Sequence, residues 1–357
     1  MAIMGTMVRV GGALASASVL AGTPPAGLRA EGTLAHAAPL VDRAATLTPV
    51  DRLSVLTYNV HGLPAILRKS DVAPLSAISD RLADLRRRGR QPGVVVLQEA
   101  FTDDAKRIGV DAGYRYVVTG PGIDERGASP PSDRVTEIDR STHWWVGEGM
   151  GKHVDSGLMV LSDYPVVGIR RLAFAEGACA GIDCLSNKGA LLVTVSLPGH
   201  AAPIDIATTH FNSRGSAGVS ASRSLVAFRR QVSALLEWVE RERHPERPLV
   251  VAGDFNVGKA RERRAAFFSG LALRQDRLPL RDAVADYARG SALPECAREA
   301  RDRAKDWQLW QDGRSLRLKP VAVEVPFGHE ADGSMLSDHI GFAVQYRLLP
   351  ASDGQGR

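Results

Sequence analysis

Short apolar runs alternate with amphipathic segments along most of this 357-residue chain. The runs are rich in Val, Ile and Leu and are bounded by Gly, Pro, Asn or Asp, which is the pattern of buried strands. They predict strands over Leu53–Tyr58, Val94–Gln98, Tyr114–Thr119, Gly157–Leu161, Ala190–Ser196, Ile204–Thr209, Leu249–Ala252 and Ile340–Tyr346. Weaker patterns predict two further strands, Trp307–Gln311 and Val321–Val325.

Helical periodicity occupies some of the intervals between these runs. It predicts helices over Leu75–Arg88, Ser220–Arg243, Arg261–Leu271 and Pro294–Lys305. Several strands follow one another without a helix between them, so the pattern favours an α/β fold with two sheets packed face to face and helices outside. The stretch Gly120–Asp155 is irregular and long for a plain connection, which is typical of a functional loop or an edge excursion.

The N-terminal residues differ from the rest of the chain. Arg9 precedes a short apolar run, Val10–Ala21, and Ala35–Ala37 offers a small-residue cleavage site. These three features predict an export signal and a secreted or periplasmic protein; an Ala-rich N-terminus without a targeting role is the alternative. We therefore expect a signal peptide over 1–37, a spacer over 38–50, one folded domain over 51–349 and a disordered tail over 350–357.

Charge and cysteine content change this picture only slightly. The chain has 45 Lys and Arg against 40 Asp and Glu, a mildly basic balance that suits a polyanion or an anionic membrane surface. No apolar stretch is long enough to span a bilayer. Cys179 and Cys184 are close together in a polar loop, where an exported protein can form a local disulfide, which leaves Cys296 as a buried or free thiol.

Polar side chains follow the apolar runs at the points where the strands end or begin. They are Asn59, Glu99, His210, Asp254, Asn256, Asp338 and His339. Each one alone is more simply explained as a turn former, a cap or a surface residue. Together they would gather carboxylates, amides and imidazoles at one mouth of a sandwich, as active sites gather at strand ends in other α/β folds.

Such a set matches the needs of phosphoester hydrolysis. Glu99, with Asn59 and Asp338, would supply the oxygen ligands that Mg²⁺ prefers. Asp254 would orient or deprotonate water, and Asn256 would donate to a phosphoryl oxygen. His210 and His339 would supply imidazole donors.

The motifs T-Y-N-V-H-G, L-Q-E, S-G-L-M-V-L-S, T-H-F-N, G-D-F-N and S-D-H follow one another between Leu53 and Tyr346. This order resembles the endonuclease/exonuclease/phosphatase superfamily of metal-dependent phosphoesterases. The resemblance implies a four-layer α/β sandwich of two packed mixed sheets flanked by helices. It implies Mg²⁺ as cofactor, with Mn²⁺ or Co²⁺ as substitutes.

The same resemblance implies individual roles. Glu99 and Asn59 would hold the metal, with Asp338 in its outer shell. Asp254 and Asn256 would act on water and phosphate, and His339 would stabilise the transition state. His210 matches the second catalytic histidine of the family. Asp306 is the candidate for the acid that orients the last histidine, although Trp307 follows it where the family usually has Tyr.

The loop from Cys179 to Gly189 looks like the sphingomyelinase-type phospholipase C branch of this superfamily. In it, Lys188 would approach a phosphate or headgroup; a solvated lysine in an Asn-Lys-Gly turn is the alternative. Trp144 and Trp145, like Trp307 and Trp310, are either interfacial aromatics or core residues.

The sequence therefore predicts a secreted Mg²⁺-dependent phosphodiesterase that cleaves sphingomyelin or a related phospholipid at a membrane surface. The alternative is a secreted nuclease, for which the clusters Arg86–Arg88 and Arg261–Arg264 would contact a nucleic acid backbone. Solvated helix faces explain the same clusters without nucleic acid. We expect a monomer with no stable protein partner.

Overall fold

The structure is a computed structural model that describes residues 50–64, 74–127 and 141–351. The expected signal peptide, the spacer up to residue 49 and the tail beyond residue 351 lie outside the described residues. Every helix in the described part of the chain is too short or too polar to cross a bilayer.

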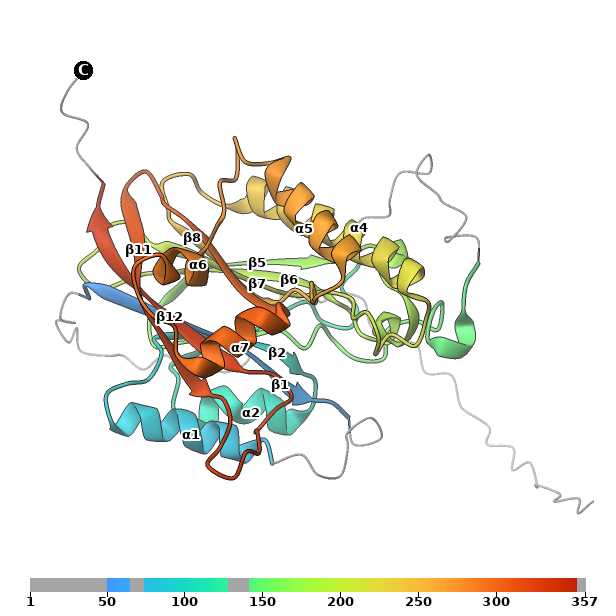
Figure 1. Cartoon of the computed structure of the whole chain (residues 1–357), viewed down its shortest axis with the longest axis horizontal. Coiled ribbons are helices and arrows are strands. Elements are labelled where there is room, and N and C mark those ends of the chain that lie inside the picture. The colour runs from blue at the N-terminus through green and yellow to red at the C-terminus, as the bar shows by residue number, and fades with distance from the viewer. Residues whose placement is uncertain (1–49, 65–73, 128–140, 352–357) are drawn as a thin grey trace, which may run out of the picture. The chain divides into compact units, whose positions relative to one another are not determined.

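Two six-stranded sheets form from the described residues (Figure 1). The first sheet has the order β11-β12-β1-β2-β4-β3. Its strands are β1 (Arg52–Gly62), β2 (Val94–Ala100), β3 (Tyr116–Thr119), β4 (Met159–Ser162), β11 (Leu316–Phe327) and β12 (Gly341–Pro350). Within it, β1 and β2 are parallel and the other neighbours are antiparallel.

The second sheet has the order β5-β6-β7-β8-β10-β9. Its strands are β5 (Val166–Ala173), β6 (Gly189–Val195), β7 (Ile204–His210), β8 (Leu249–Asp254), β9 (Arg281–Asp282) and β10 (Asp306–Gln311). Here β7 and β8 form the parallel pair. Each sheet is therefore mixed, with one central parallel pair.

Helices cover the outer faces of both sheets. On the first sheet, α1 (Ser76–Arg87) and α2 (Asp103–Asp111) lie side by side; on the second, α4 (Ala221–Glu242) and α5 (Arg261–Ala272) do so (Figure 1). Two short helices, α6 (Ala283–Ala288) and α7 (Glu295–Arg303), pack against β10 and β11. Apolar side chains fill the space between the sheets and beneath each helical layer. This arrangement confirms the four-layer α/β sandwich.

Apart from short 3₁₀ turns, two strands and two α-helices of the described residues were not predicted from the sequence. The strands β5 and β9 and the helices α2 and α6 fall where the apolar pattern is weak. Strand β5 is largely exposed, so Arg170 and Arg171 interrupt its apolar run. Helix α2 begins after Thr102, whose hydroxyl accepts from the backbone N–H of Ala105 and satisfies one of the open donors of the first turn.

The two parallel pairs bring their carboxyl ends to the same region of the sandwich. Strand β1 packs against β8 and β10, and β2 packs against β7 and β8. Among the buried polar bonds that cross between the sheets is one from the amide nitrogen of Gln98 to the hydroxyl of Thr208 at 3.2 Å. The residues that follow β1 and β2 therefore face those that end β7 and β8.

Candidate active site

The second sheet aligns three site residues by strand register. His210 ends β7 and pairs with Asp254 at the end of β8, and Asp254 pairs with Asp306 at the start of β10. All three side chains are buried. A carboxylate oxygen of Asp254, Oδ2, lies 3.6 Å from Nε2 of His210.

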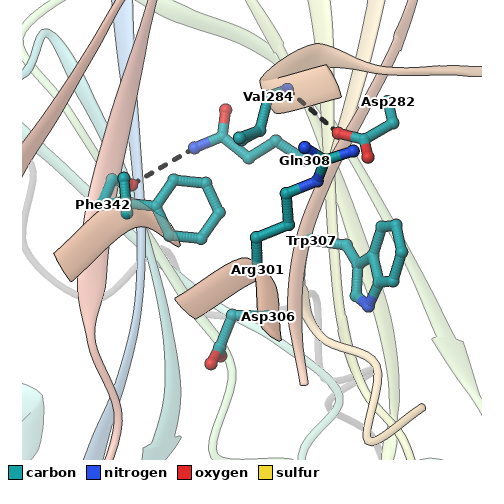
Figure 2. A pocket seen from close by; sticks show the side chains of 8 residues that line it. Asp282, Val284, Arg301, Asp306, Trp307, Gln308 and Phe342 are labelled. Atoms are coloured by element: carbon teal, nitrogen blue, oxygen red, sulfur yellow. Dashed lines mark hydrogen bonds between the residues drawn. The ribbon is translucent and has the colours of Figure 1, made fainter. Parts of the chain in front are cut away.

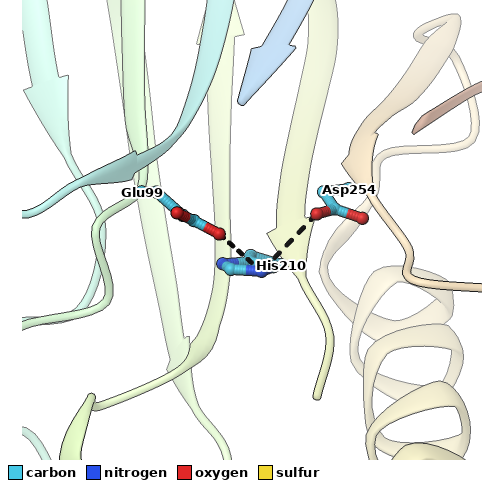
Figure 3. A group of neighbouring side chains, drawn as sticks. All are labelled: Glu99, His210 and Asp254. Atoms are coloured by element: carbon cyan, nitrogen blue, oxygen red, sulfur yellow. Dashed lines mark ion pairs between the residues drawn. The ribbon is translucent and has the colours of Figure 1, made fainter. Parts of the chain in front are cut away.

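The first sheet supplies Asn59 and Glu99 from the ends of its parallel pair. The side-chain nitrogen of Asn59 donates to Oε1 of Glu99 at 2.9 Å and to Oδ2 of Asp254 at 3.1 Å. Oε1 of Glu99 also lies 3.7 Å from Nε2 of His210. Figure 3 shows the imidazole of His210 between the two carboxylates. The predicted residues of the two sheets thus meet in one cluster.

Three residues around this cluster have positive φ although none is glycine. They are His61 (φ 51°), Glu99 (φ 58°) and Asn256 (φ 48°). Left-handed backbone at such residues costs on the order of 1 kcal/mol or more and concentrates at functional sites. Here it turns the chain out of the strands directly where the polar side chains are presented.

His339 is held by Asp306 in a buried ion pair. Nδ1 of His339 lies 2.8 Å from Oδ2 of Asp306, and its Nε2 lies 3.7 Å from Oδ2 of Asp254. Burial lowers the pKa of His339, but the charges of Asp306 and Asp254 outweigh it and raise that pKa to about 9. Burial pushes the pKa of Asp306 upward, against the pull of the ion pair. The 2.8 Å contact favours the proton on His339, whose Nε2 then faces Asp254 as a donor.

His210 has the opposite tendency. Its burial and the neighbouring Lys188 lower its pKa, so it is neutral near pH 7. Nζ of Lys188 lies 3.3 Å from Nε2 of His210, donates to the carbonyl of Phe211 and pairs with Oδ1 of Asp183 at 2.7 Å. The alternative of a solvated turn lysine is therefore wrong: Lys188 is buried and paired. The sequence pattern had not singled out Asp183, although it lies in the same cysteine loop.

Asp338 stands apart from the buried cluster. Its side chain is 57% exposed, and Oδ1 lies 3.3 Å from Nδ1 of His61. Nδ1 of His61 is also 3.6 Å from Oε2 of Glu99, so this histidine bridges the two carboxylates. The hydrogen bond with Asp338 raises the pKa of His61, and His61 in turn helps to hold the pKa of Asp338 low against the effect of burial. His61 lies within T-Y-N-V-H-G but had been given no role.

The amides of Asn59 and Asn256 are both committed within the site. The side-chain oxygen of Asn59 accepts from the backbone N–H of His61 at 3.0 Å, so its nitrogen faces the carboxylates. The side-chain nitrogen of Asn256 donates to the carbonyl of Phe211 at 3.0 Å and approaches Asp254 at 3.3 Å. In this arrangement both amides orient the carboxylates. Ligation of a metal by Asn59 would need its amide to turn over.

The cluster has the donor set of a metal site. Ligand atoms of Glu99, His210 and Asp254 lie within 4.8 Å of one another, as do those of Asp254, Asp306 and His339. Oε2 of Glu99 is buried and has no hydrogen-bond partner among the described residues. An orphaned carboxylate oxygen of this kind fits a hard divalent cation.

Beside Asn256 a cleft of about 410 Å³ opens between two loops. Arg214, Lys259 and Lys305 line it, with the carboxylate of Glu262 close to Arg214 at 3.8 Å. Nζ of Lys305 lies 3.4 Å from Nε2 of His339, so the cleft leads to the catalytic cluster. Its cationic lining suits an anionic substrate.

A second, very small cavity lies beside Asp306 (Figure 2). Arg301 reaches from α7 toward Asp282 and Gln308, whereas the carboxylate of Asp306 points away from it. The amide of Gln308 donates to the carbonyls of Val55 and Phe342 and so ties β10 to the first sheet. The strand that begins at Asp306 is thus fixed to the first sheet two residues after Asp306.

The remaining sequence expectations concern cysteines and tryptophans. A disulfide joins Cys179 and Cys184, and Cys296 is a partly buried free thiol. Core packing is wrong as an explanation for Trp144 and Trp145, which are 67% and 64% exposed. It holds for the other two: Trp310 is buried between the sheets, and Trp307 packs against the layer beneath α5.

Solved structures share this fold. Beta toxin from Staphylococcus aureus, a mutant with bound magnesium ions, aligns over 82% of this chain and 98% of its own, with 17% identity and a TM-score of 0.52. Sphingomyelinase C from Streptomyces griseocarneus aligns over 83% and 99%, with 20% identity and a TM-score of 0.52. The human Nocturnin catalytic domain, with a bound sulfate anion, aligns over 84% and 96%, with 16% identity and a TM-score of 0.51.

Identity at this level shows the fold alone, and no curated protein matches the chain by sequence. The sequence profile of the endonuclease/exonuclease/phosphatase family, however, matches residues 56–339. That match covers strands of both sheets, from β1 to β11, and every residue of the cluster, from Asn59 to His339. The chain belongs to the endonuclease/exonuclease/phosphatase family.

Proposed function

We propose that this chain is an exported, Mg²⁺-dependent phosphodiesterase that hydrolyses sphingomyelin or a related phospholipid and releases the phosphorylated headgroup. One observation carries the catalytic part of the proposal. The buried carboxylate of Asp254 lies within 3.7 Å of Nε2 of both His210 and His339, with Glu99 on the other side of His210. The carboxylate of Asp254, the neutral imidazole of His210 and the protonated imidazole of His339 thus lie close together at one site.

The protonation states suit attack of water on phosphorus. Burial raises the pKa of Asp254, but the charge of the protonated His339 outweighs it and lowers that pKa, so Asp254 is ionised and can accept a proton from water. The water oxygen forms the new bond to phosphorus as the bond from phosphorus to the ester oxygen breaks, and the departing oxygen takes up a proton from solvent water. His339 is protonated near neutral pH and can donate to a phosphoryl oxygen, while Asp306 holds its ring in place.

Glu99 is the residue we assign to the metal, because its Oε2 is buried and accepts no hydrogen bond from the described residues. Asp338, joined to Glu99 through His61, would lie in the outer shell. A bound Mg²⁺ supplies charge neutralisation for the phosphoryl oxygens and lowers the pKa of water. The magnesium ions in the beta toxin structure support this choice of metal.

Three observations support the substrate class. The name of the similar sphingomyelinase C gives one. The cysteine loop of the sequence gives another, and the exposed Trp144 and Trp145 give the third. The cationic cleft beside Asn256 would accept a lipid phosphate, and it would also accept a nucleic acid backbone.

The deciding experiment gives the purified protein three substrates: sphingomyelin vesicles, plasmid DNA and an inositol polyphosphate, each with Mg²⁺ and with EDTA. We expect phosphocholine release from sphingomyelin with Mg²⁺ only. Cleavage of DNA without lipid turnover would overturn the lipid assignment and leave the nuclease.

Two variants distinguish a loss of metal binding from a general effect on the fold. Glu99→Gln keeps the shape of the side chain and removes its charge, so we expect loss of at least about 10²-fold in kcat. Glu240→Gln breaks a surface ion pair with Arg274 on the helical layer and is the matched control. Full activity of Glu99→Gln would remove Glu99 from the proposed metal site.

A further inference from the structure

Two adjacent tryptophans project from a short turn that the catalytic cluster does not use. Trp144 and Trp145 lie in the 3₁₀ turn Trp144–Val146 and are 67% and 64% exposed. Their rings meet edge to face at 6.0 Å, and the ring of His143 stacks on Trp145 at 5.1 Å. Met150 and Ile182, 53% and 40% exposed, complete what we call the tryptophan patch: Trp144, Trp145, Met150 and Ile182.

The turn lies directly on the cysteine loop. Gly147 has φ +96°, and a Cβ there would lie 3.3 Å from the Cα of Ile182 and 3.0 Å from the Cγ of Leu185. Glycine suits this position, because the backbone is left-handed and a Cβ would be tightly crowded by the neighbouring chain. Ile182 therefore stands beside the tryptophan turn although it is distant in sequence.

A buried carboxylate fixes the turn in place. The side chain of Glu148 accepts from the backbone N–H of His143 at 2.8 Å and of Gly181 at 2.9 Å. Arg223 of α4 binds both of its oxygens, at 2.6 and 2.7 Å. Lys152 adds two bonds from its ammonium group, to the carbonyls of Cys184 and Ser186.

These contacts order the backbone beneath the patch and leave the tryptophan rings in solvent. Large apolar side chains in water are unfavourable and contribute nothing to a core. A turn that is already ordered loses little further entropy when its side chains bind a partner. The combination is typical of a preformed binding surface.

The charges around the patch select the partner. Within the described residues 141–153 the one carboxylate, that of Glu148, is buried and bound to Arg223. The other ionisable residues of this stretch are His143, Lys152 and His153, none of which can carry a negative charge. Tryptophan prefers the headgroup level of a bilayer, where its ring is half in apolar surroundings and its N–H reaches polar groups. Neutral or positive neighbours suit the phosphate layer there.

The patch is also linked to the catalytic cluster. Asp183 follows Ile182 directly and pairs with Lys188, whose ammonium group lies 3.3 Å from Nε2 of His210. Only the side chains of Asp183 and Lys188 therefore separate Ile182 of the tryptophan patch from His210 of the catalytic cluster.

We propose that the tryptophan patch docks the protein on a phospholipid surface and so presents the catalytic cluster to lipid phosphates. The role of docking in bringing the site to its substrate rests on the proposed function. The docking itself is independent of hydrolysis and is measured separately.

The test measures binding to sonicated vesicles in EDTA, where hydrolysis is suppressed, by co-sedimentation and by quenching of tryptophan fluorescence with brominated phosphatidylcholine. Vesicles are made of phosphatidylcholine alone and of phosphatidylcholine with sphingomyelin. We expect the double variant Trp144→Ser/Trp145→Ser to bind at least about tenfold more weakly than the wild type. Binding of the wild type should persist in high salt, because apolar insertion is not screened.

Leu273→Ser is the matched control, since Leu273 is 81% exposed on a different part of the surface, just after α5. It should bind vesicles like the wild type. Thermal unfolding of each variant confirms that it is folded. Should the double variant fail to fold, Ile182→Ser tests the same surface with one milder change.

The outcomes separate the two proposals. Vesicle binding that depends on the tryptophans, without turnover of sphingomyelin, would support docking and overturn the proposed substrate. Equal binding by wild type and double variant would overturn docking, whatever the protein hydrolyses. A change of oligomeric state in the double variant, seen by sedimentation and without any change in vesicle binding, would assign the patch to a second copy of the chain and overturn the proposal.

Discussion

Asp306 begins β10 and reaches His339, which precedes β12 of the other sheet, at 2.8 Å between Oδ2 and Nδ1. The ion pair therefore joins the two halves of the sandwich inside the site. We expect Asp306→Asn to lower kcat by about 10²–10⁴-fold with little change in KM, because His339 loses the charge that keeps it protonated and aligned. The alkaline limb of the pH–rate profile should move to lower pH. Asp302→Asn, on the exposed face of α7, is the control, and wild-type kcat in Asp306→Asn would contradict the orienting role.

The same pair makes stability depend on pH. The folded-state pKa of His339, about 9, lies above the value of about 6.5 for an unfolded histidine, so folding favours the protonated form. Its contribution is complete below about pH 6.5 and is lost as pH rises through about 9. In EDTA, the difference in unfolding free energy between wild type and His339→Gln should therefore shrink over this interval in urea titrations. A difference that stays constant with pH would contradict the raised pKa.

Metal binding should stabilise the fold as well as support activity. A ligand that binds only the folded state adds about 2.7 kcal/mol at a concentration of one hundred times its Kd. We expect Mg²⁺ to raise the urea midpoint of the wild type and to leave that of Glu99→Gln unchanged. Stabilisation of both proteins to the same extent would place the metal elsewhere.

Lys188 and Asp183 form a buried ion pair, so removal of one partner should cost more than removal of both. Lys188→Met leaves the carboxylate of Asp183 without its cation and should destabilise the protein by about 3–5 kcal/mol. The double variant Lys188→Met/Asp183→Asn should recover much of this loss. Lys259→Met, an exposed lysine of the cleft, is the control for stability. Additive losses in chemical denaturation would show that the pair is not coupled.

Arg263 is almost fully buried in α5 and is bound chiefly by carbonyls. Its guanidinium donates to the carbonyls of Asn212 and Asn256, at 2.7 and 2.8 Å, and so clamps the loops after β7 and β8. Burial lowers its pKa to about 10. Arg263→Met should destabilise the protein by about 3–5 kcal/mol, since it leaves several buried carbonyls without a hydrogen-bond donor. Arg264→Met, on the exposed face of the same helix, should change the stability little. Equal unfolding midpoints for the two variants would contradict the clamp.

The fold was predictable where burial on both faces gives an unbroken apolar run. Strands β2, β6, β7 and β8 are of this kind and were all predicted. Strand β11 was predicted only over Val321–Val325, although it extends from Leu316 to Phe327. Lys319 and Pro320 conceal its earlier part, because an edge strand tolerates both residues.

Glu99, His210 and Asp254 were predictable because they lie at the ends of three of these strands, β2, β7 and β8, but their geometry was not. The left-handed backbone of Glu99 cannot be recognised from residue type, since glutamate has no preference for it. His61 and Asp183 were given no role because each acts through a side-chain contact, with Asp338 or with Lys188, that residue type and spacing do not predict. Tertiary packing decides which side chains of different loops pair, and the local sequence pattern does not predict those pairs.

The division of the site between two sheets has a consequence for folding. Asn59 and Glu99 come from the first sheet, and His210 and Asp254 from the second, so neither sheet holds a working half. A collapsed intermediate with both sheets formed but not yet closed on each other would show native far-ultraviolet circular dichroism and no catalysis. The rate at which activity recovers during refolding should therefore report the packing of the two sheets against each other, and not the formation of their strands.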